Sequence, residues 1–205
     1  ETDRALFEEL TSTIIRQVGD LRKMVDEFSS FARLPKPVFR MENPVDLARQ
    51  ALFLQEVARP DIQFDFRTLA AIDPIACDRH QFGQAMTNVL KNAVEAVDAK
   101  AKTAGEAYRR RISVEMTMSG GEGDRAVGIA ITDNGIGLPT DRERIVEPYV
   151  TTREKGTGLG LAIVNKIVEE HGGEMTFSPV EGGTRVTMTF ACEPVAVRRN
   201  SEAAE

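Results

Sequence analysis

The chain has 205 residues, of which 41% are hydrophobic and 28% charged, and a formal net charge of −6. This length and composition suit one globular domain with an appendage, and the acidic balance argues against non-specific nucleic-acid binding as the main activity. Two distant cysteines exclude a disulfide framework and favour a reducing compartment, and no apolar run is long enough to span a bilayer.

The N-terminal part of the sequence predicts one long amphipathic helix. Residues 3–33 contain no proline, and their apolar side chains recur three or four residues apart, at Leu10, Ile14, Val18, Leu21, Val25, Phe28 and Ala32. A helix of this length cannot bury such a seam by itself. We therefore expect it to pair with a second helix, in another chain or in a part of the protein outside this chain.

The remaining elements mix helices and strands. Pro35-Lys36-Pro37 ends the first helix, and Asn43 and Asp78 are typical N-caps of two further helices, which run to about Val57 and Lys100. Alternating or buried apolar runs predict the strands, and a second amphipathic pattern predicts a last helix; their approximate bounds are 62–66, 111–118 and 126–132, then helix 158–170, then a hairpin of 174–179 and 184–190. Because strands and helices do not alternate strictly, the pattern favours an α/β sandwich.

A glycine-rich segment carries the strongest chemical signal. Gly156, Gly158 and Gly160 alternate directly before a predicted helix, and Arg153 and Lys155 precede them. Glycine lets the backbone approach an anion, and a helix N-terminus presents N–H groups to it. The segment lacks the Gly-Lys-Ser/Thr ending of a P-loop. On its own it leaves polyphosphate binding and a flexible loop before a core helix equally open.

Two further motifs are ambiguous when taken singly. Asp133, in Asp-Asn-Gly-Ile-Gly-Leu-Pro, ends a buried strand, where its carboxylate can accept a hydrogen bond from an amine such as that of adenine. Asn88 and Asn92 lie on one face of an apolar helix, and amide oxygens suit Mg²⁺ when phosphates supply other ligands. An ordinary turn and a solvated stripe explain each motif alone. Together with the glycine-rich segment, they predict one cleft for a metal, a base and a triphosphate.

The order of these motifs resembles the ATP-binding catalytic domain of bacterial sensor histidine kinases, in the GHKL group that includes gyrase, heat-shock chaperone ATPases and MutL. The N box, first glycine box, F box and second glycine box match Asn88–Ala93, Asp133–Gly137, Glu147–Thr152 and Gly156–Gly160. Tyr149 stands where the F box usually has phenylalanine, and residues 182–184 are similar to the closing hairpin of the family. Segments 25–33 and 151–157 resemble nitrogen-regulation kinases of the NtrY type.

The resemblance implies an α+β fold, a two-layer α/β sandwich of the Bergerat (GHKL) type, over residues 41–191. Residues 1–34 would be the second helix of the dimerisation hairpin, 35–40 a linker and 192–205 a disordered tail. The parent kinase would form a homodimer through helix 3–33 and would pass phosphate to a response-regulator receiver domain. We expect this fragment to be cytoplasmic and to contact neither nucleic acid nor membrane, whereas the parent would be an inner-membrane sensor.

The resemblance also implies a role for each matching residue, with ATP and Mg²⁺ as cofactors. Asn92 would coordinate the metal, Asn88, Lys91 and Lys155 would lie at the phosphates, and Asp133 would read the adenine amine. The other nucleotide-binding positions, around the base, along a lid over about residues 139–155 and in the second glycine box, would be Gly135, Ile136, Gly137, Leu138, Thr152, Arg153, Gly156, Thr157, Gly158, Leu159, Gly160 and Thr184.

The family transfers phosphate to a histidine, and neither histidine of this chain lies on the first predicted helix. We interpret His80 as a surface residue and His171 as a cation near a helix C-terminus. The resemblance then implies that the acceptor histidine lies upstream of residue 1. Asn88 stands where gyrase- and MutL-type ATPases have a glutamate base, and an amide cannot take a proton from water. We therefore expect slow ATP hydrolysis and transfer of the γ-phosphoryl group to that histidine.

Two alternatives remain at this point. A serine kinase of the anti-sigma-factor type would share the fold, although the long first helix argues against it. A nucleotide-binding scaffold without catalysis would share the motifs, although their completeness argues against loss of activity.

Overall fold

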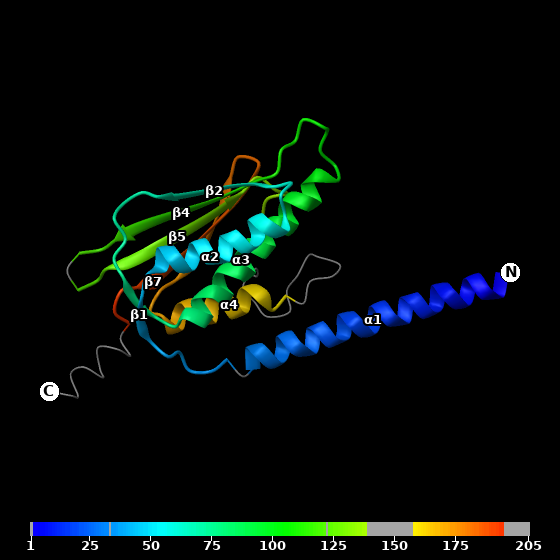
Figure 1. Cartoon of the computed structure of the whole chain (residues 1–205), viewed down its shortest axis with the longest axis horizontal. Coiled ribbons are helices and arrows are strands. Elements are labelled where there is room, and N and C mark those ends of the chain that lie inside the picture. The colour runs from blue at the N-terminus through cyan, green and yellow to red at the C-terminus, as the bar shows by residue number, and fades with distance from the viewer. Residues whose placement is uncertain (1, 33, 122, 139–157, 195–205) are drawn as a thin grey trace.

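The structure is a computed structural model that describes residues 2–32, 34–121, 123–138 and 158–194. Within these residues the elements follow in the order α1 (Thr2–Ala32), β1 (Arg40–Glu42), α2 (Pro44–Ala58), β2 (Gln63–Thr68), β3 (Ile75–Cys77), α3 (Arg79–Ala101), β4 (Arg111–Ser119), β5 (Ala126–Asp133), α4 (Gly160–Glu170), β6 (Met175–Val180) and β7 (Gly183–Ala191). Figure 1 shows α2, α3 and α4 on one side of the sheet and α1 extending away from both layers.

Five strands form the main sheet, in the order β2-β4-β5-β7-β6. The pair β2–β4 is parallel and the other three pairs are antiparallel. Along β4, buried Ile112, Val114 and Met116 alternate with less buried residues, as expected for a sheet with one face on the core. The predicted two-layer α/β sandwich is therefore confirmed.

The core lies between this sheet and the helices. Phe82, Met86 and Leu90 of α3 are fully buried, and the Phe82 ring packs 4.8 Å from that of Phe190 on β7, measured between centroids. Burying a side chain of this size stabilises the fold by about 1.5–3 kcal/mol. This packing fixes α3 between α2, α4 and the sheet, and with it the backbone positions of the polar residues on this helix.

Both predicted N-caps are confirmed. The Asn43 side chain accepts hydrogen bonds from the N–H groups of Val45 and Asp46, and Pro44 occupies the first turn of α2. The Asp78 carboxylate accepts from the N–H groups of His80 and Gln81 at 2.9 and 3.1 Å. These side chains satisfy backbone donors that a helix start leaves without partners.

The N-terminal cap of α3 also attaches the linker that follows α1. The second oxygen of Asp78 accepts a hydrogen bond from Val38 N at 2.8 Å, and Gln81 Nε2 donates to the Pro35 carbonyl at 2.8 Å. Burial alone would raise the pKa of Asp78, but the hydrogen bonds from Val38, Gln81 and His80 outweigh it and lower that pKa. The linker is thus bound to α3 by two long-range hydrogen bonds.

His171 corrects the sequence interpretation. It follows α4 as expected, but it is fully buried, and burial lowers its pKa, so it is neutral rather than a cation. Its Nε2 accepts from Asp78 N at 3.0 Å, which assigns the proton to Nδ1, 2.7 Å from the Ile167 carbonyl. Its ring also meets Phe39 edge-on, 5.2 Å between centroids. His80 is exposed, as predicted.

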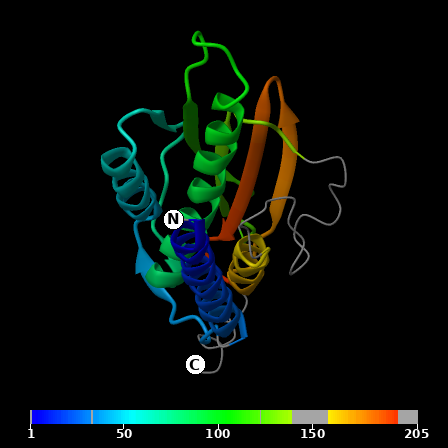
Figure 2. The same cartoon turned by 90° about the vertical axis from the view of Figure 1, so that its right-hand side faces the viewer.

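The apolar seam of α1 is uncovered. Its described large apolar side chains remain 46–69% exposed, among them Leu10, Ile14, Leu21 and Phe28. Figure 2 views α1 from near its N-terminal end and shows it beside α4, with which it is in contact. No helix of the described residues is both long and apolar enough to cross a membrane.

Candidate functional site

Asp133 ends β5 at the centre of the sheet. Its side chain is buried, with 6% exposure for the residue, and its Oδ1 accepts a hydrogen bond from Gly135 N at 2.8 Å. Across the β5–β7 ladder Asp133 pairs with Thr184, which is equally buried. Gly183 packs so closely that a methyl group there would collide with the Asp133 carbonyl oxygen. The structure therefore brings together Asp133 and Thr184, two of the residues that the resemblance assigns to nucleotide binding.

The turn after Asp133 presses against α3. A methyl group on Gly135 would lie 2.5 Å from the carbonyl carbon of Ala96, and Ile136 N donates to the Ala96 oxygen at 3.3 Å. Gly137 has φ +81°, a backbone conformation that L side chains rarely adopt. Both glycines of the motif are thus required by backbone geometry.

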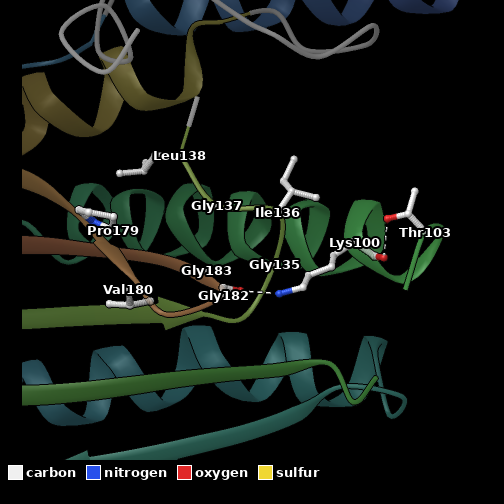
Figure 3. Close-up of a pocket in the computed structure, with 10 residues that line it drawn as sticks. All are labelled: Lys100, Thr103, Gly135, Ile136, Gly137, Leu138, Pro179, Val180, Gly182 and Gly183. Carbon is white, nitrogen blue, oxygen red and sulfur yellow. Dashed lines mark hydrogen bonds between the residues drawn. The ribbon is translucent and has the colours of Figure 1, made fainter. Parts of the chain in front are cut away.

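A pocket of about 490 Å³ opens beside this turn. Figure 3 shows it between the turn, the end of α3 and the tip of the β6–β7 hairpin. Ile136, one of the residues that line this pocket, is 61% exposed. Its lining residues are Lys100, Thr103, Gly135, Ile136, Gly137, Leu138, Pro179, Val180, Gly182 and Gly183.

The N-box asparagines lie on α3, in the stretch that packs against α4. Asn88 Nδ2 donates to the carbonyl of Gly160 at 3.3 Å, which joins the first residue of α4 to α3 and leaves the amide oxygen as the acceptor of that side chain. Asn92 lies one turn further and is half-buried, whereas Lys91 is exposed. The structure therefore places the N box next to Gly160, at the described end of the second glycine box.

The described end of the second glycine box forms the start of α4. Gly158 has φ +70°, Leu159 is fully buried and anchors the helix in the core, and nothing lies within 4 Å of a methyl group built on Gly160. The F box, the lid and five predicted site residues lie outside the described residues; these five are Thr152, Arg153, Lys155, Gly156 and Thr157.

Sequence reasoning missed the residues that surround the Asp133 turn. Tyr108 donates its hydroxyl proton to Asn134, and Lys100 Nζ donates to the Gly182 carbonyl at 2.6 Å. Neither belongs to a motif, because each reaches its partner across a long stretch of chain. Of these residues, Asn134 could have been found from the sequence, because it is the second residue of the Asp-Asn-Gly turn motif.

The comparisons with known proteins agree with this geometry. Residues 77–194 match the model of the family described as histidine kinase-, DNA gyrase B-, and HSP90-like ATPase. The nitrogen regulation protein NtrY of Azorhizobium caulinodans is 48% identical over 194 residues, which are 93% of this chain and 24% of NtrY. This chain thus spans about a quarter of the length of that relative.

Solved structures of histidine kinases share the fold. Full-length ShkA in complex with AMPPNP is 26% identical, with a TM-score of 0.68 over 91% of this chain and 39% of that one. ThkA, in complex with the response regulator protein TrrA, has a TM-score of 0.69 at 24% identity, over 89% of this chain and 50% of that one. In this two-layer sandwich, the helix that carries Asn88 and Asn92 is joined to the glycine-rich start of α4. The chain belongs to the family of histidine kinase-, DNA gyrase B- and HSP90-like ATPases.

Proposed function

We propose that this chain is the ATP-binding catalytic portion of a sensor histidine kinase of the NtrY type. It transfers the γ-phosphoryl group of ATP to a histidine outside residues 1–205, for relay to a response-regulator aspartate. The observation that carries the proposal is the convergence on α3: the helix bonds to Gly160 through Asn88 and holds the Asp133 turn through Ala96. One helix thereby borders the proposed phosphate end and the proposed base end.

The proposed roles follow the chemistry of these groups. The side-chain oxygens of Asn92 and Asn88 suit Mg²⁺ when nucleotide phosphates complete the coordination. Among the described residues, no group of three or more His, Cys, Asp or Glu side chains could hold a metal ion. The carboxylate of Asp133, with Thr184 beside it, accepts a hydrogen bond from the adenine amine. Gly158–Gly160 approach the phosphates through the backbone. The bound metal supplies charge stabilisation to the transferred group, and this chain positions the nucleotide.

The two histidines of the chain support an external acceptor. His171 is buried with both ring nitrogens engaged, so it has no route to a phosphoryl group. His80 is exposed at the start of α3 and therefore does not lie on the proposed dimerisation helix α1. The uncovered seam of α1 supports a dimerisation helix (1–34), with the homodimer of the parent kinase formed through helix 3–33. A linker (35–40), a catalytic domain (41–191) and a tail (192–205) complete the proposed division, although the domain includes Cys192, whose N–H donates to Arg125 and whose carbonyl accepts from Ala76.

The proposed partner and location extend the same hypothesis. ThkA has been solved with the response regulator protein TrrA, and this chain shares its fold. A receiver domain is accordingly the proposed recipient of the phosphate. A cytoplasmic location, below a membrane-bound sensor, is part of the proposal.

Nucleotide binding is tested first, by calorimetry with AMPPNP in the presence and absence of Mg²⁺. We expect Mg²⁺ to strengthen binding, and both Asn92→Ala and Asp133→Ala to weaken it by about tenfold or more. Lys102→Ala, an exposed change at the end of α3, is the matched control and keeps wild-type affinity. A folded wild-type chain that binds no AMPPNP contradicts the proposal.

Phosphoryl transfer is tested with radiolabelled ATP and a supplied helical hairpin that carries an acceptor histidine. We expect an acid-labile, base-stable phosphoprotein, which identifies phosphohistidine. An acid-stable product would indicate a serine kinase instead. Binding without any transfer would indicate a nucleotide-binding scaffold.

A further inference from the structure

Tyr108 lies behind the Asp133 turn, in the connection between α3 and β4. Its hydroxyl is 3.0 Å from the Asn134 carbonyl oxygen and 3.1 Å from Asn134 Oδ1, so its one proton is shared between two acceptors of the same residue. Burial raises the pKa of Tyr108 above its ordinary value, with the charge of Asp133 as a further cause. The hydroxyl therefore stays protonated and donates at neutral pH.

The rest of Asn134 is held by the same connection. Its Nδ2 donates to the Arg109 carbonyl at 2.7 Å, and its Oδ1 accepts from Arg111 N at 2.9 Å. Its own N–H donates to the Arg111 carbonyl at 3.2 Å. Asn134 stands between Asp133 and Gly135, so residues 108–111 fix one side of the turn while α3 fixes the other through Ala96.

Lys100 connects the same structure to the hairpin. Its Nζ donates to the Gly182 carbonyl at 2.6 Å and lies 5.5 Å from the centre of the Tyr108 ring. Figure 3 shows this side chain reaching from the end of α3 to the hairpin tip across the Asp133 turn. Because Gly183 packs on the Asp133 carbonyl, a displacement of the hairpin tip would also displace Asp133.

We propose that Tyr108 and Lys100 are positioning residues for recognition of the base. They hold the turn from its outer side and from the hairpin side, so that the Asp133 carboxylate meets the adenine amine at hydrogen-bonding distance. This inference rests on the proposed ATP site. Neither residue contributes to binding of the triphosphate, since the proposed phosphate groups lie at the opposite end of the site, at Asn88, Asn92 and Gly160. Their loss therefore weakens discrimination between bases rather than nucleotide binding as a whole.

The test compares ATP with inosine triphosphate, which carries an oxygen in place of the adenine amine. Affinities of both nucleotides, with Mg²⁺, are measured calorimetrically for the whole chain. We expect wild type to prefer ATP, and Tyr108→Phe and Lys100→Met to lower this preference by about three- to tenfold while affinity for inosine triphosphate changes by less than about twofold. Lys100→Arg keeps a donor for Gly182 and restores the preference, and Lys102→Met is the matched exposed control.

The outcomes separate the inference from the function on which it rests. If wild type prefers ATP and the ratio is unchanged in Tyr108→Phe and Lys100→Met, the positioning role is wrong and the nucleotide site stands. An equal loss for both nucleotides also overturns it, because that is the result of a general structural role. If wild type binds neither nucleotide, or both equally, base reading by Asp133 fails and the inference fails with it. Circular dichroism of each variant shows that it is folded.

Discussion

At the scale of single residues, the glycines of the candidate site fall into two kinds. A methyl group on Gly135 would meet the backbone of Ala96, whereas one on Gly83, in the second turn of α3, would have nothing within 4 Å. The first glycine is required by a close approach of two chain segments. The second lowers helix stability without any steric need.

We predict opposite effects for the two alanine substitutions. Gly135→Ala forces the turn away from α3, so it lowers the free energy of unfolding by about 2 kcal/mol or more and weakens AMPPNP binding. Gly83→Ala raises the free energy of unfolding by about 0.5–1 kcal/mol, because alanine favours helix. Urea denaturation of both variants measures these changes. A Gly135→Ala protein as stable as wild type would show that the turn is not confined.

The buried His171 predicts a pH dependence of stability. Its folded-state pKa is below the ordinary value of 6.5, so below that pH the unfolded chain binds more protons than the folded one. Stability from this residue is present above pH 6.5 and is lost as pH falls, by at most about 1.4 kcal/mol per pH unit. His171→Gln, which does not titrate, has a flatter profile between pH 7.5 and 5.

The control for this prediction is His80→Gln, which removes the exposed histidine and keeps the wild-type profile. Thermal unfolding at a series of pH values provides the measurement. Identical slopes for wild type and His171→Gln would show that the buried imidazole does not govern this range.

Site residues were predictable from sequence where chemistry and spacing coincide. Asp133 and Gly135 belong to a short motif, and the hydrogen bond from Gly135 N to Asp133 Oδ1 joins residues only two positions apart. Tyr108 and Lys100 act on partners 26 and 82 residues away, so no local pattern marks them. The predicted positive charge of His171 was wrong. A position at a helix C-terminus indicates a cation, but His171 is buried against Phe39 and Phe190, which come from distant segments.

At the scale of elements, the two N-caps differ in what they hold. Asn43 satisfies only N–H groups of its own helix, whereas Asp78 also binds Val38 of the linker. Each cap was readable from the sequence, because a polar residue before an apolar helix is a local signal. The contact with Val38 was not, since it joins residues 40 positions apart.

We predict that the caps contribute unequally to stability. Asn43→Ala costs about 1 kcal/mol, the usual cost of losing a helix cap. Asp78→Ala costs about 2 kcal/mol or more, because it removes three hydrogen bonds, one of them between segments. The comparison requires urea denaturation curves with equal slopes. Equal losses for the two variants would mean that the bond to Val38 adds nothing.

Strands were predicted less completely than helices. The longer helices were located to within two residues, because their periodic apolar faces extend over many turns. The three-residue strands β1 and β3 were missed, since three residues are too few to show alternation. Their antiparallel pairing, with Arg40 opposite Cys77, is a tertiary contact.

At the scale of the whole molecule, α1 is the feature that the rest of the fold does not explain. The described apolar side chains of its seam are exposed along its length, and a helix with such a seam is stable when another helix covers it. We therefore predict concentration-dependent self-association through α1. The double variant Ile14→Glu, Leu21→Glu weakens it by more than about tenfold, since each residue buries a large apolar side chain in the interface.

Sedimentation velocity over a range of concentrations measures this association. Arg16→Glu changes the charge of α1 outside the seam and is the matched control. A wild-type chain that stays monomeric at every concentration would contradict self-association of this chain.

The pairing of β5 with β7 also determines when this domain can fold. Asp133 is joined to Thr184 and Ala126 to Ala191, so the middle of the sheet is built from segments that are synthesised far apart in time. Such non-local pairings slow folding, because a long loop must close before they form. While the chain is still on the ribosome, β4 and β5 can form a hairpin, but the free edge of β5 has no partner strand until β7 has emerged. The Asp133–Thr184 pair is therefore formed last, and a chain truncated before β7 leaves that strand edge exposed to aggregation.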